Sequence, residues 1–395
     1  MKETDACGFI YMPASSVVEI LNAEPINTTS SLQEAGKNPP MAQAIVRGHL
    51  PVPNVQELAQ AWNRSSEPVP EWYLRAEEEA TADEVVAGGV IPVVDLSKLL
   101  DPQATEKELA KLGTACKQGF FQLINHGVPD EVLLDAKRDI TEFFKLPLET
   151  KEVYKQLPDG LQGYGSAFVF SETQKLDWSN MLYLLLRPIE LRDMRFWPAQ
   201  PPSFRNSVDR YSAETAKVVS CLLRFLAVDM GVEQNRLLDI FGGQPQNMKV
   251  TYYPPCREAG KVMGVSSHTD ASALTLLLHV NDVQGLQFRS DDGRWLNVEP
   301  IDRAFVVSVG DILEILSNGR YKSVEHRVVV HPSKQRISAA MFHQVDRSTT
   351  IGPLPELVEG GGVSRYRSVS HADFLKHFFA TKFDGRKSHL DHYKI

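Results

Sequence analysis

Apolar side chains recur at helical spacing in several stretches of the first half of the chain. They do so from Val132 to Phe144 and again from about Phe204 to Met230, and both stretches predict amphipathic helices with one buried side. A shorter helix through about Lys117 is expected to start at the pair Thr105-x-x-Glu108, which matches a capping box. These patterns predict that helices dominate the chain before about residue 240.

Short runs rich in β-branched and aromatic residues predict strands. Two lie early, IPVVDLSKLL (Ile91–Leu100) and GFFQLINHG (Gly119–Gly127). After Gly242-Gly243 the runs follow closely, at 248–253, 273–280, 285–298, 304–309, 326–331 and 336–345. Asp292-Gly293 is a strong hairpin signal and divides the third of these runs into two strands. The order predicts an α+β chain with a mainly β jelly-roll core and flanking N-terminal helices.

The same patterns divide the chain into four parts. Residues 1–40 are polar and weakly patterned, and they predict a loosely ordered extension. Residues 41–240 predict a helical and mixed region, residues 241–350 the jelly-roll core, and residues 351–395 a C-terminal helical segment. No internal repeat is visible, so we expect the helical and β parts to merge into one unit.

Composition narrows the class of function. The chain has 395 residues, 43% of them hydrophobic, and its net charge of −8 is poorly suited to coating nucleic acid or anionic lipid. Its four cysteines form no C-x-x-C pair, which argues against a zinc cluster or a disulfide scaffold. No apolar run of about 18 residues and no signal-peptide pattern is present. We expect a cytoplasmic protein, a monomer, that acts on a small molecule and not on nucleic acid or a membrane.

The first candidate for chemistry is His268-x-Asp270, beside the predicted strand at 273–280. On extended backbone, residues i and i+2 face the same way, so both side chains can meet one cation. The pattern alone is weak, because His371-x-Asp373 and His389-x-Asp391 repeat it. For an isolated copy, a polar strand end is the better interpretation.

His326 strengthens the interpretation of His268-x-Asp270 as part of a metal site. It begins a β-branched run and lies far enough beyond Asp270 to reach the site on a different strand. Together with His268 it would complete a set of two histidines and one carboxylate, the facial triad that binds iron(II) and leaves other coordination positions open. Taken alone, His326 reads more simply as a hydrogen-bonded strand histidine.

Arg336-Ile337-Ser338 follows on the next predicted strand. Arg336 and Ser338 would share one face of that strand, and an arginine fork beside a hydroxyl suits a carboxylate. Four other R-x-S copies fall on a helix start or in polar flanking segments. The alternative is a surface arginine paired with an acid. Tyr253 could donate to the same carboxylate, and a core tyrosine is an equally good interpretation of it.

In these residues the chain resembles the plant iron(II)- and 2-oxoglutarate-dependent dioxygenases. The motifs span about residues 48 to 395 in a fixed order and include NMKVTYYPPC, HTDASALTLLLH, GLQF, GDILEILSNGRYKSVEHRVVV and RISAAMF. The resemblance implies a double-stranded β-helix (jelly-roll) core. It implies iron(II), 2-oxoglutarate and oxygen as cofactors, with ascorbate as reductant. It also implies oxidation of an organic substrate with release of succinate and carbon dioxide.

The resemblance also assigns roles to individual residues. It makes His268, Asp270 and His326 the iron ligands, and it makes Arg336 and Ser338 the holders of the distal carboxylate of 2-oxoglutarate, assisted by Tyr253. Relatives commonly carry asparagine where this chain has Thr251, so one contact to the cosubstrate differs. Phe342, Met181 and Tyr183 would lie near the organic substrate.

The resemblance leaves the organic substrate open. Parts of the chain are similar to flavonol and anthocyanidin synthases, whereas Leu176–Pro198 is more similar to the senescence-related, demethylating and herbicide-detoxifying relatives. Gln344 stands where an anthocyanidin synthase would carry glutamate. The reaction could be hydroxylation, desaturation or dealkylation of a plant specialised metabolite, hormone or xenobiotic. The alternatives are a flavonol-synthase type of flavonoid oxidase, a zinc hydrolase, a 2-oxoglutarate-independent oxidase and a non-catalytic metabolite-binding relative.

Overall fold

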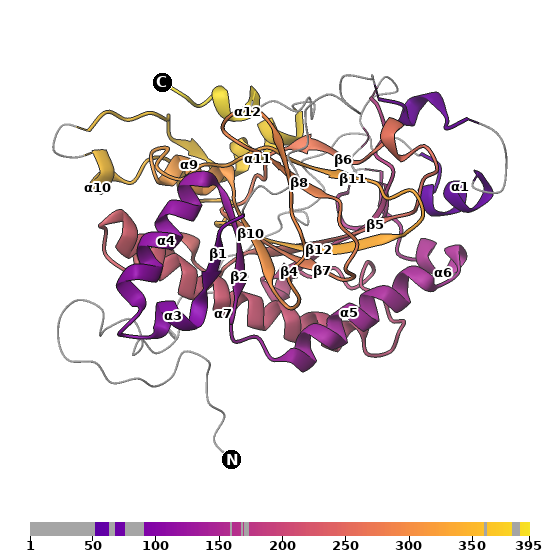
Figure 1. Ribbon diagram of the computed structural model, residues 1–395, viewed down its shortest axis with the longest axis horizontal. Helices are drawn as coiled ribbons and strands as arrows, with labels where there is room; N and C mark the ends of the chain where they lie inside the picture. The colour runs from indigo at the N-terminus through magenta and orange to yellow at the C-terminus, as the bar shows by residue number, and fades with distance from the viewer. Residues whose placement is uncertain are drawn as a thin grey trace, which may run out of the picture.

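The computed structural model describes residues 52–62, 68–75, 91–158, 160–166, 169, 174–358, 362–380 and 388–395. The predicted extension at residues 1–40 lies outside these ranges. Figure 1 shows β-sheets in the middle of the molecule, with the long helices α5 (Asp130–Lys145) and α7 (Phe204–Met230) along one side of them. The division of the sequence into four parts stays a prediction.

The larger sheet has eight strands and carries most of the core. Its strands, in spatial order, are β1 (Val93–Asp95), β2 (Phe120–Ile124), β10 (Phe305–Val309), β7 (Leu274–His279), β12 (Arg336–His343), β5 (Gln246–Tyr253), β4 (Asn180–Arg187) and β3 (Gly163–Gly165). All neighbours pair antiparallel except β1 and β2. Strands that are distant in sequence therefore become neighbours at the centre of the sheet.

The smaller sheet has four strands. Its order is β6 (Met263–His268), β11 (His326–Val329), β8 (Leu286–Arg289) and β9 (Trp295–Asn297). Residues of β6, β8 and β11 line one pocket together with residues of β5, β7, β10 and β12, so the two sheets face each other across it. This double-sheet arrangement with flanking helices confirms the predicted α+β jelly roll.

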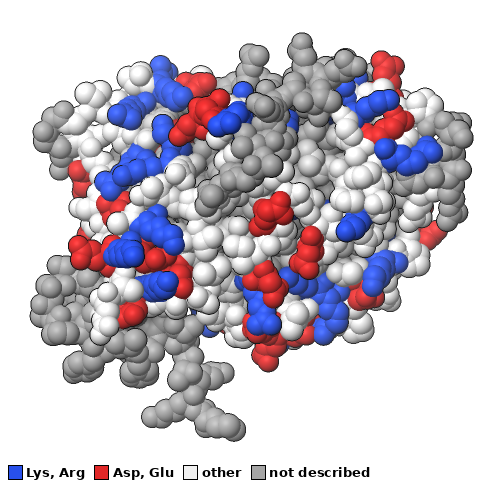
Figure 2. Space-filling view, in the orientation of Figure 1, with Lys and Arg blue, Asp and Glu red and all other residues white. Residues whose placement is uncertain are grey.

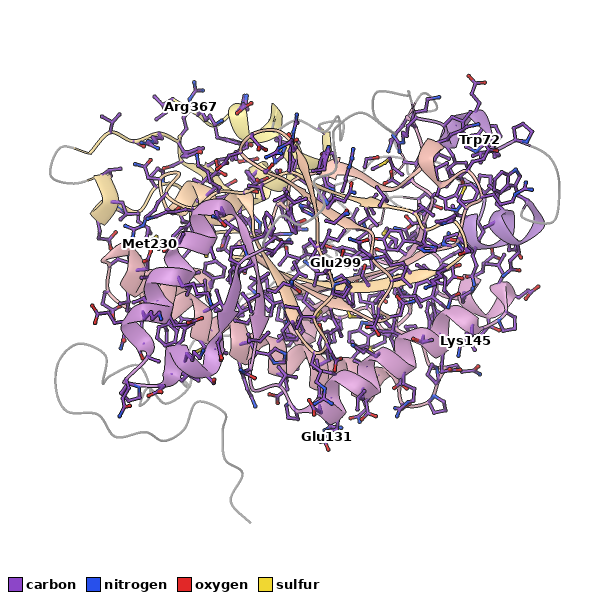
Figure 3. The ribbon with its side chains drawn as sticks, in the orientation of Figure 1. Trp72, Glu131, Lys145, Met230, Glu299 and Arg367 are labelled. Atoms are coloured by element: carbon purple, nitrogen blue, oxygen red, sulfur yellow. The ribbon has the colours of Figure 1, made fainter. Side chains whose placement is uncertain are left out.

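Period-two alternation assigns each face of the large sheet. On β5, Thr251 lines the pocket, whereas Met248 and Val250 join the main hydrophobic core. The core on that outer side is completed by α5 and α7, which contribute buried residues such as Phe143 and Leu222. The helices thus bury the outer face of the sheet and leave its inner face for the pocket. Figure 3 shows Glu131 and Lys145 of α5 pointing away from this body.

The long helices confirm the sequence pattern closely. The predicted helix from about Phe204 to Met230 is α7, which is capped by the following Gly231, a residue with a φ of 78° that favours glycine. The predicted helix at Val132–Phe144 is α5. Both carry a wide apolar face, which is the feature that sequence periodicity detects best.

Two early predictions were wrong in detail. α4 (Thr105–Gln118) begins as expected, but Thr105 donates to the carbonyls of Leu99 and Asp101 and caps no N–H group. The Glu108 carboxylate accepts instead from the backbone N–H of Asp95. A capping box is therefore absent, because Thr105 bonds carbonyls of the segment just before the helix and Glu108 bonds the backbone of Asp95.

The run Ile91–Leu100 was predicted as one strand, and only its first part is one. The strand β1 ends at Asp95, and α3 (Leu96–Leu100) follows. The Asp95 carboxylate accepts from the backbone N–H of Ser97 at 3.0 Å and so caps this helix. A polar cap within an apolar run separates the two elements.

Most of the strands after residue 240 are predicted well. β5, β7, β8, β9, β10, β11 and β12 all fall within or beside the predicted runs, and Gly293, with a φ of 86°, lies between β8 and β9 as expected. The later strands β6, β13 (Thr350–Ile351) and β14 (Val369–Ser370) were not predicted, and neither were the early strands β3 and β4.

The remaining elements are short and connect or cover the sheets. They are α1 (Val55–Trp62), η2 (Glu71–Tyr73), α6 (Leu148–Glu152), η3 (Ile189–Leu191), α8 (Arg236–Phe241), η4 (Ala259–Lys261), α9 (Asp311–Leu316), β13 (Thr350–Ile351), α10 (Pro355–Val358), β14 (Val369–Ser370), α11 (His371–Ala380) and α12 (Ser388–Asp391). Within the described ranges, every helix is too short or too polar to span a lipid bilayer.

Candidate metal centre and cosubstrate pocket

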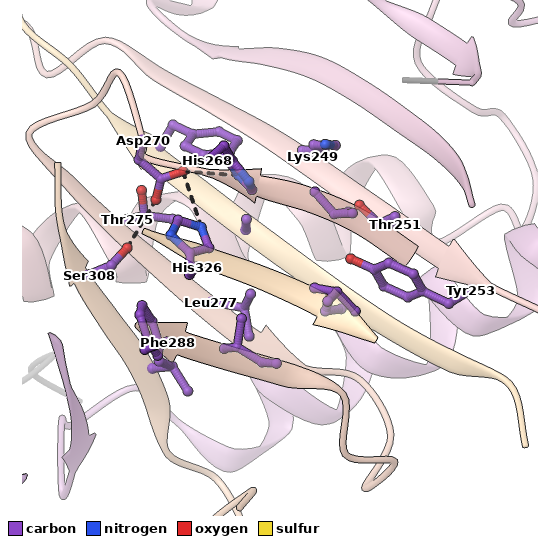
Figure 4. A pocket seen from close by; sticks show the side chains of 17 residues that line it. Lys249, Thr251, Tyr253, His268, Asp270, Thr275, Leu277, Phe288, Ser308 and His326 are labelled. Carbon is purple, nitrogen blue, oxygen red and sulfur yellow. Dashed lines mark hydrogen bonds and ion pairs between the residues drawn. The ribbon is translucent and has the colours of Figure 1, made fainter. Parts of the chain in front are cut away.

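His268, Asp270 and His326 come together at one end of the pocket (Figure 4). Asp270 Oδ1 lies 3.8 Å from His268 Nε2 and 3.6 Å from His326 Nε2. Each of the three residues offers one ligand atom, and these atoms all lie within 4.8 Å of one another. A single cation between them could contact all three.

The fold explains why these residues meet. His268 is the last residue of β6, and His326, the first residue of β11, is its direct antiparallel partner. Asp270 follows in the connection to β7 and does not lie on the strand, so the two-residue spacing works through a strand end followed by a turn. The backbone N–H of Asp311 donates to the Asp270 carbonyl at 2.8 Å and fixes that turn.

Backbone contacts orient both imidazoles toward one point. His268 Nδ1 lies 2.8 Å from the Ser266 carbonyl oxygen, and His326 Nδ1 lies 3.4 Å from the Val324 carbonyl oxygen. A ring that donates from Nδ1 presents the lone pair of Nε2, which is the tautomer that a metal requires. Burial, assisted by the nearby His326, lowers the pKa of His268 to about 3 and favours its neutral form.

The Asp270 carboxylate divides its two oxygen atoms between protein and site. Oδ2 accepts from the Ser308 hydroxyl at 3.0 Å, and Oδ1 faces the two imidazoles. Burial acts to raise the pKa of this carboxyl, but His326, His268 and hydrogen bonds from Thr275 and Ser308 outweigh it and lower the pKa. A buried carboxylate beside two imidazoles is the donor set that suits iron(II).

The rest of the pocket is largely apolar. It has a volume of about 540 Å³ including its open mouth, and it extends from the triad toward Tyr253 (Figure 4). The apolar lining comes from both sheets: Val265, Leu277, Leu286, Phe288, Val306 and Val328. Such walls exclude water from the metal end and leave the few polar groups to orient what binds.

Arg336 and Ser338 lie together on the pocket side of β12. Arg336 is 1% exposed, its Nη1 donates to Ser338 Oγ at 3.0 Å, and its guanidinium carbon lies 5.0 Å from the centre of the Tyr253 ring. Arg336 Nε and Nη2 have no hydrogen-bond partner among the described residues. Burial lowers the pKa of Arg336, and Tyr253 acts in the opposite direction.

This arrangement has the chemistry of an anion anchor. A buried guanidinium with unpaired donors is costly unless an acceptor arrives, and a carboxylate matches its fork. Gly285 provides room for the arginine stem, because a Cβ there would lie 3.1 Å from Arg336 Cδ and 2.7 Å from the Val329 carbonyl oxygen. The alternative of a surface arginine paired with an acid is contradicted by this burial.

The residues expected near the organic substrate are placed differently from one another. Phe342 lines the pocket. Met181 and Tyr183 lie on β4, opposite Thr251 and Lys249 of β5, and neither belongs to the pocket lining. Phe342 thus lines the pocket that holds the triad, whereas Met181 and Tyr183 face the same side of the large sheet on β4, one strand beyond β5.

The other two H-x-D copies lie outside the triad. His371 is buried, with Nδ1 3.3 Å from the Asp346 carbonyl oxygen, and Asp373 is exposed. His389 is 6% exposed and its Nε2 hydrogen-bonds Asp311 Oδ2, to which Thr269 Oγ1 also donates. His389 of the C-terminal helix α12 therefore supports the turn that carries Asp270.

His389→Ala is expected to lower the free energy of unfolding by about 2 kcal/mol, because it leaves the buried Asp311 carboxylate without a hydrogen bond to a ring nitrogen. Urea unfolding of the metal-free protein measures this loss. His392→Ala, an exposed histidine of the same segment, should stay within about 0.5 kcal/mol of the wild type. Equal stabilities of the two variants would contradict the support role.

Sequence reasoning missed several polar groups around the site. Lys249 lines the pocket and shares the alternation of Tyr253 on β5, so the period-two pattern could have found it. Asp177 Oδ1 accepts from the backbone N–H of Ser266 at 3.0 Å and from Arg75 at 2.9 Å, and it thereby holds the residue whose carbonyl orients His268. Only the fold reveals these contacts of Asp177, because Arg75, Asp177 and Ser266 come from three distant segments.

Comparison with known families gives two matches. The model of the 2OG-Fe(II) oxygenase superfamily matches residues 244–345, which include the triad and Arg336. The model of the N-terminal region of non-haem dioxygenases in morphine synthesis matches residues 91–200. The first match contains β5 to β12, and the second contains β1 to β4 with the helices α3 to α6.

Individual relatives are similar over nearly their whole length. The chain is 52% identical to the 2-oxoglutarate-dependent dioxygenase 11 of Oryza sativa subsp. japonica, over 88% of this chain and 97% of that protein. It is 45% identical to S-norcoclaurine synthase 1 of Coptis japonica, over 89% and 98%. A crystal structure of JOX2 in complex with 2OG, Fe and JA superposes with a TM-score of 0.80 at 34% identity, over 89% of this chain and 100% of that one. The chain therefore belongs to the family of plant iron(II)- and 2-oxoglutarate-dependent dioxygenases.

Proposed function

We propose that this dioxygenase binds iron(II) through His268, Asp270 and His326, and anchors 2-oxoglutarate through Arg336, Ser338 and Tyr253. The observation that carries the proposal is the pairing of two features in one pocket. A complete set of two histidines and one carboxylate lies at one end. A buried arginine with unpaired donors lies beyond the other end, beside Tyr253 and Ser338.

Both groups fit the residues present. The three ligand atoms lie within 4.8 Å of one another, and the remaining oxygen of Asp270 is already bonded to Ser308. The unpaired N–H groups of Arg336 match the distal carboxylate of a diacid. Bound iron(II), with 2-oxoglutarate and oxygen, would supply the oxidant that attacks the organic substrate, and succinate and carbon dioxide would be released.

The protein's own residues bind, orient and shelter the reactants. Ser266 and Val324 fix the two imidazoles through their backbone carbonyls, and Ser308 fixes the carboxylate. Arg336 sets the far end of the cosubstrate and thereby the position of its keto acid end. The apolar walls keep bulk water away from the metal end, which protects the oxidant from side reactions.

The organic substrate is proposed as a small plant specialised metabolite, hormone or xenobiotic that is hydroxylated, desaturated or dealkylated. Relatives named codeine O-demethylase and flavonoid 7-O-demethylase, at 38% and 40% identity, support this class. Phe342 would contact the substrate directly, and Met181 and Tyr183 would shape the site from β4, the strand beyond β5. Acidic and basic side chains are interspersed on the face in Figure 2, which favours a small molecule over nucleic acid.

A flavonol-synthase type of flavonoid oxidase is the nearest alternative. A zinc hydrolase with the same three ligands would need a general base beside the metal, and it gives Arg336 no role. A 2-oxoglutarate-independent oxidase or a non-catalytic relative would not need the anchor. The cytoplasmic location and the monomeric state stay predictions.

The test is an anaerobic titration of the metal-free protein with iron(II) and 2-oxoglutarate. A weak visible charge-transfer band is expected, and it should disappear in His268→Ala. Turnover is then scored by succinate release with flavonoids, hormones, alkaloids and triketone herbicides. Absence of the band, or turnover supported by zinc alone, would refute the proposal. If the band forms but none of these substrates is turned over, the proposed iron and cosubstrate site would stand and the proposed class of organic substrate would be wrong.

A further inference from the structure

A row of side chains crosses three neighbouring strands on the pocket side of the large sheet. Ser338 of β12 pairs directly with Thr251 of β5 on one side and with His279 of β7 on the other. Thr275 and Leu277 of β7 line the pocket, so alternation turns His279 to the same side. Directly paired residues bring their Cβ atoms to within about 5 Å, which places His279 beside Ser338.

His279 is buried without any hydrogen bond in the described residues. It is 4% exposed, and neither of its ring nitrogens has a partner there. Burial, together with the charges of Arg336 and Lys137, lowers the pKa of His279 to about 3. The ring is therefore neutral at physiological pH and carries one N–H group. A buried donor in this state is costly unless a ligand accepts from it.

The same corner holds a second set of unpaired donors. Arg336 shares the face of Ser338 two positions along β12, and its Nε and Nη2 also lack partners among the described residues. Ser338 already accepts from Arg336 Nη1. The histidine and the arginine thus flank one hydroxyl, and both have donors to spare. A group that only accepts and carries negative charge would satisfy them together, and a carboxylate is such a group.

We propose that His279 donates its ring N–H to the distal carboxylate of 2-oxoglutarate and so completes, with Arg336 and Ser338, the part of the site that recognises a diacid. The proposal rests on the proposed function, in which Arg336 and Ser338 hold that carboxylate. It gives β7 a binding role at its C-terminal end, in addition to its apolar contribution to the pocket wall.

An ordinary core histidine is the competing interpretation, and the same sheet provides an example. His343, at the end of β12, is 1% exposed and faces the helix side, where its Nε2 lies 3.4 Å from Gln246 Nε2. His343 has the amide nitrogen of Gln246 within 3.4 Å, whereas neither ring nitrogen of His279 has a hydrogen-bond partner in the described residues. His343 is therefore the matched control.

The experiment compares two keto acids in anaerobic equilibrium titrations of the iron(II)-loaded protein, followed by the visible band of the complex. One is 2-oxoglutarate. The other is 2-oxopentanoate, which keeps the keto acid end and replaces the distal carboxylate by a methyl group. His279→Leu is expected to weaken the binding of 2-oxoglutarate about tenfold or more, because a hydrogen bond to a charged group is lost. The affinity for 2-oxopentanoate should change less than about threefold.

Further variants make the outcome decisive. His279→Gln keeps an N–H donor and should recover part of the affinity, and His279→Phe serves as the apolar variant if His279→Leu does not fold. His343→Leu should leave both affinities unchanged. Unchanged 2-oxoglutarate binding in His279→Leu, or an equal loss for both keto acids, would overturn the inference. If Arg336→Leu also keeps the wild-type preference for 2-oxoglutarate over 2-oxopentanoate, the proposed function is wrong about the residues that bind the distal carboxylate. If only His279→Leu keeps this preference, the inference about His279 alone is wrong.

Discussion

Asp270→Asn is expected to abolish succinate formation and the visible band of the iron(II)–2-oxoglutarate complex. The amide has nearly the shape of the carboxylate and can still accept from Ser308, but it carries no charge. The metal would then meet two neutral imidazoles and a weak amide oxygen. Loss of a direct ligand should cost more than the ~100-fold in metal affinity that is typical of an outer-shell partner. Anaerobic iron(II) titration measures that affinity, and succinate release measures turnover.

Asp373→Asn is the matched control, because it changes the aspartate of another H-x-D copy that is exposed and lies at the start of α11. It should leave iron binding and turnover unchanged. The metal-free Asp270→Asn protein should unfold within about 4 °C of the wild type, which separates loss of metal from loss of fold. Iron-dependent turnover that survives in Asp270→Asn would show that the triad is assigned to the wrong residues.

Arg336→Leu is expected to raise the KM for 2-oxoglutarate at least about 30-fold, corresponding to the ~2–5 kcal/mol that truncation of a buried charge pair costs. The kcat at saturating cosubstrate should change much less, because Arg336 would contact the end of the molecule that does not react. Steady-state kinetics with varied 2-oxoglutarate measure both constants. Arg205→Leu, from another R-x-S copy on the helix α7, is exposed and should leave this KM unchanged.

Although Arg336→Leu should weaken cosubstrate binding, it should raise the stability of the cosubstrate-free protein. Without cosubstrate, Arg336 holds a buried guanidinium whose Nε and Nη2 are unpaired in the described residues. Leucine removes that cost, so the free energy of unfolding of the cosubstrate-free protein should rise by about 1 kcal/mol. Saturating iron(II) and 2-oxoglutarate should stabilise the wild type far more than the variant. An Arg336→Leu protein that is less stable without cosubstrate would show that the arginine is structural.

The sequence was sufficient to select the candidate metal site because the evidence lay in spacing and alternation. His268-x-Asp270 was separated from its two copies by a later strand that begins with His326, and these residues do converge. Arg336 and Ser338 were predicted to share a face, and period two on an eight-residue strand gives that result. The long helices followed from apolar spacing in the same way.

What sequence reasoning missed depends on pairing between distant segments. The strand β6 reads MGVSSH, and its glycine and two serines have little strand propensity. It is extended because it pairs with β11, which follows much later in the chain. The neighbourhood of His279 and Ser338, and the redirection of Glu108 from a helix cap to Asp95, likewise require the tertiary fold. Local patterns contain no information about such partners.

The two ends of the pocket belong to different sheets. His268 and His326 are carried by the small sheet, and Arg336, Ser338 and Tyr253 are carried by the large one. A cosubstrate that binds at both ends would act as a brace across the jelly roll, because the sheets could not move apart without breaking a metal contact or the carboxylate contact. The organic substrate would then enter a pocket in which the distance between the two sheets is already fixed. A substrate that does not match this distance could not be accommodated by a movement of the sheets.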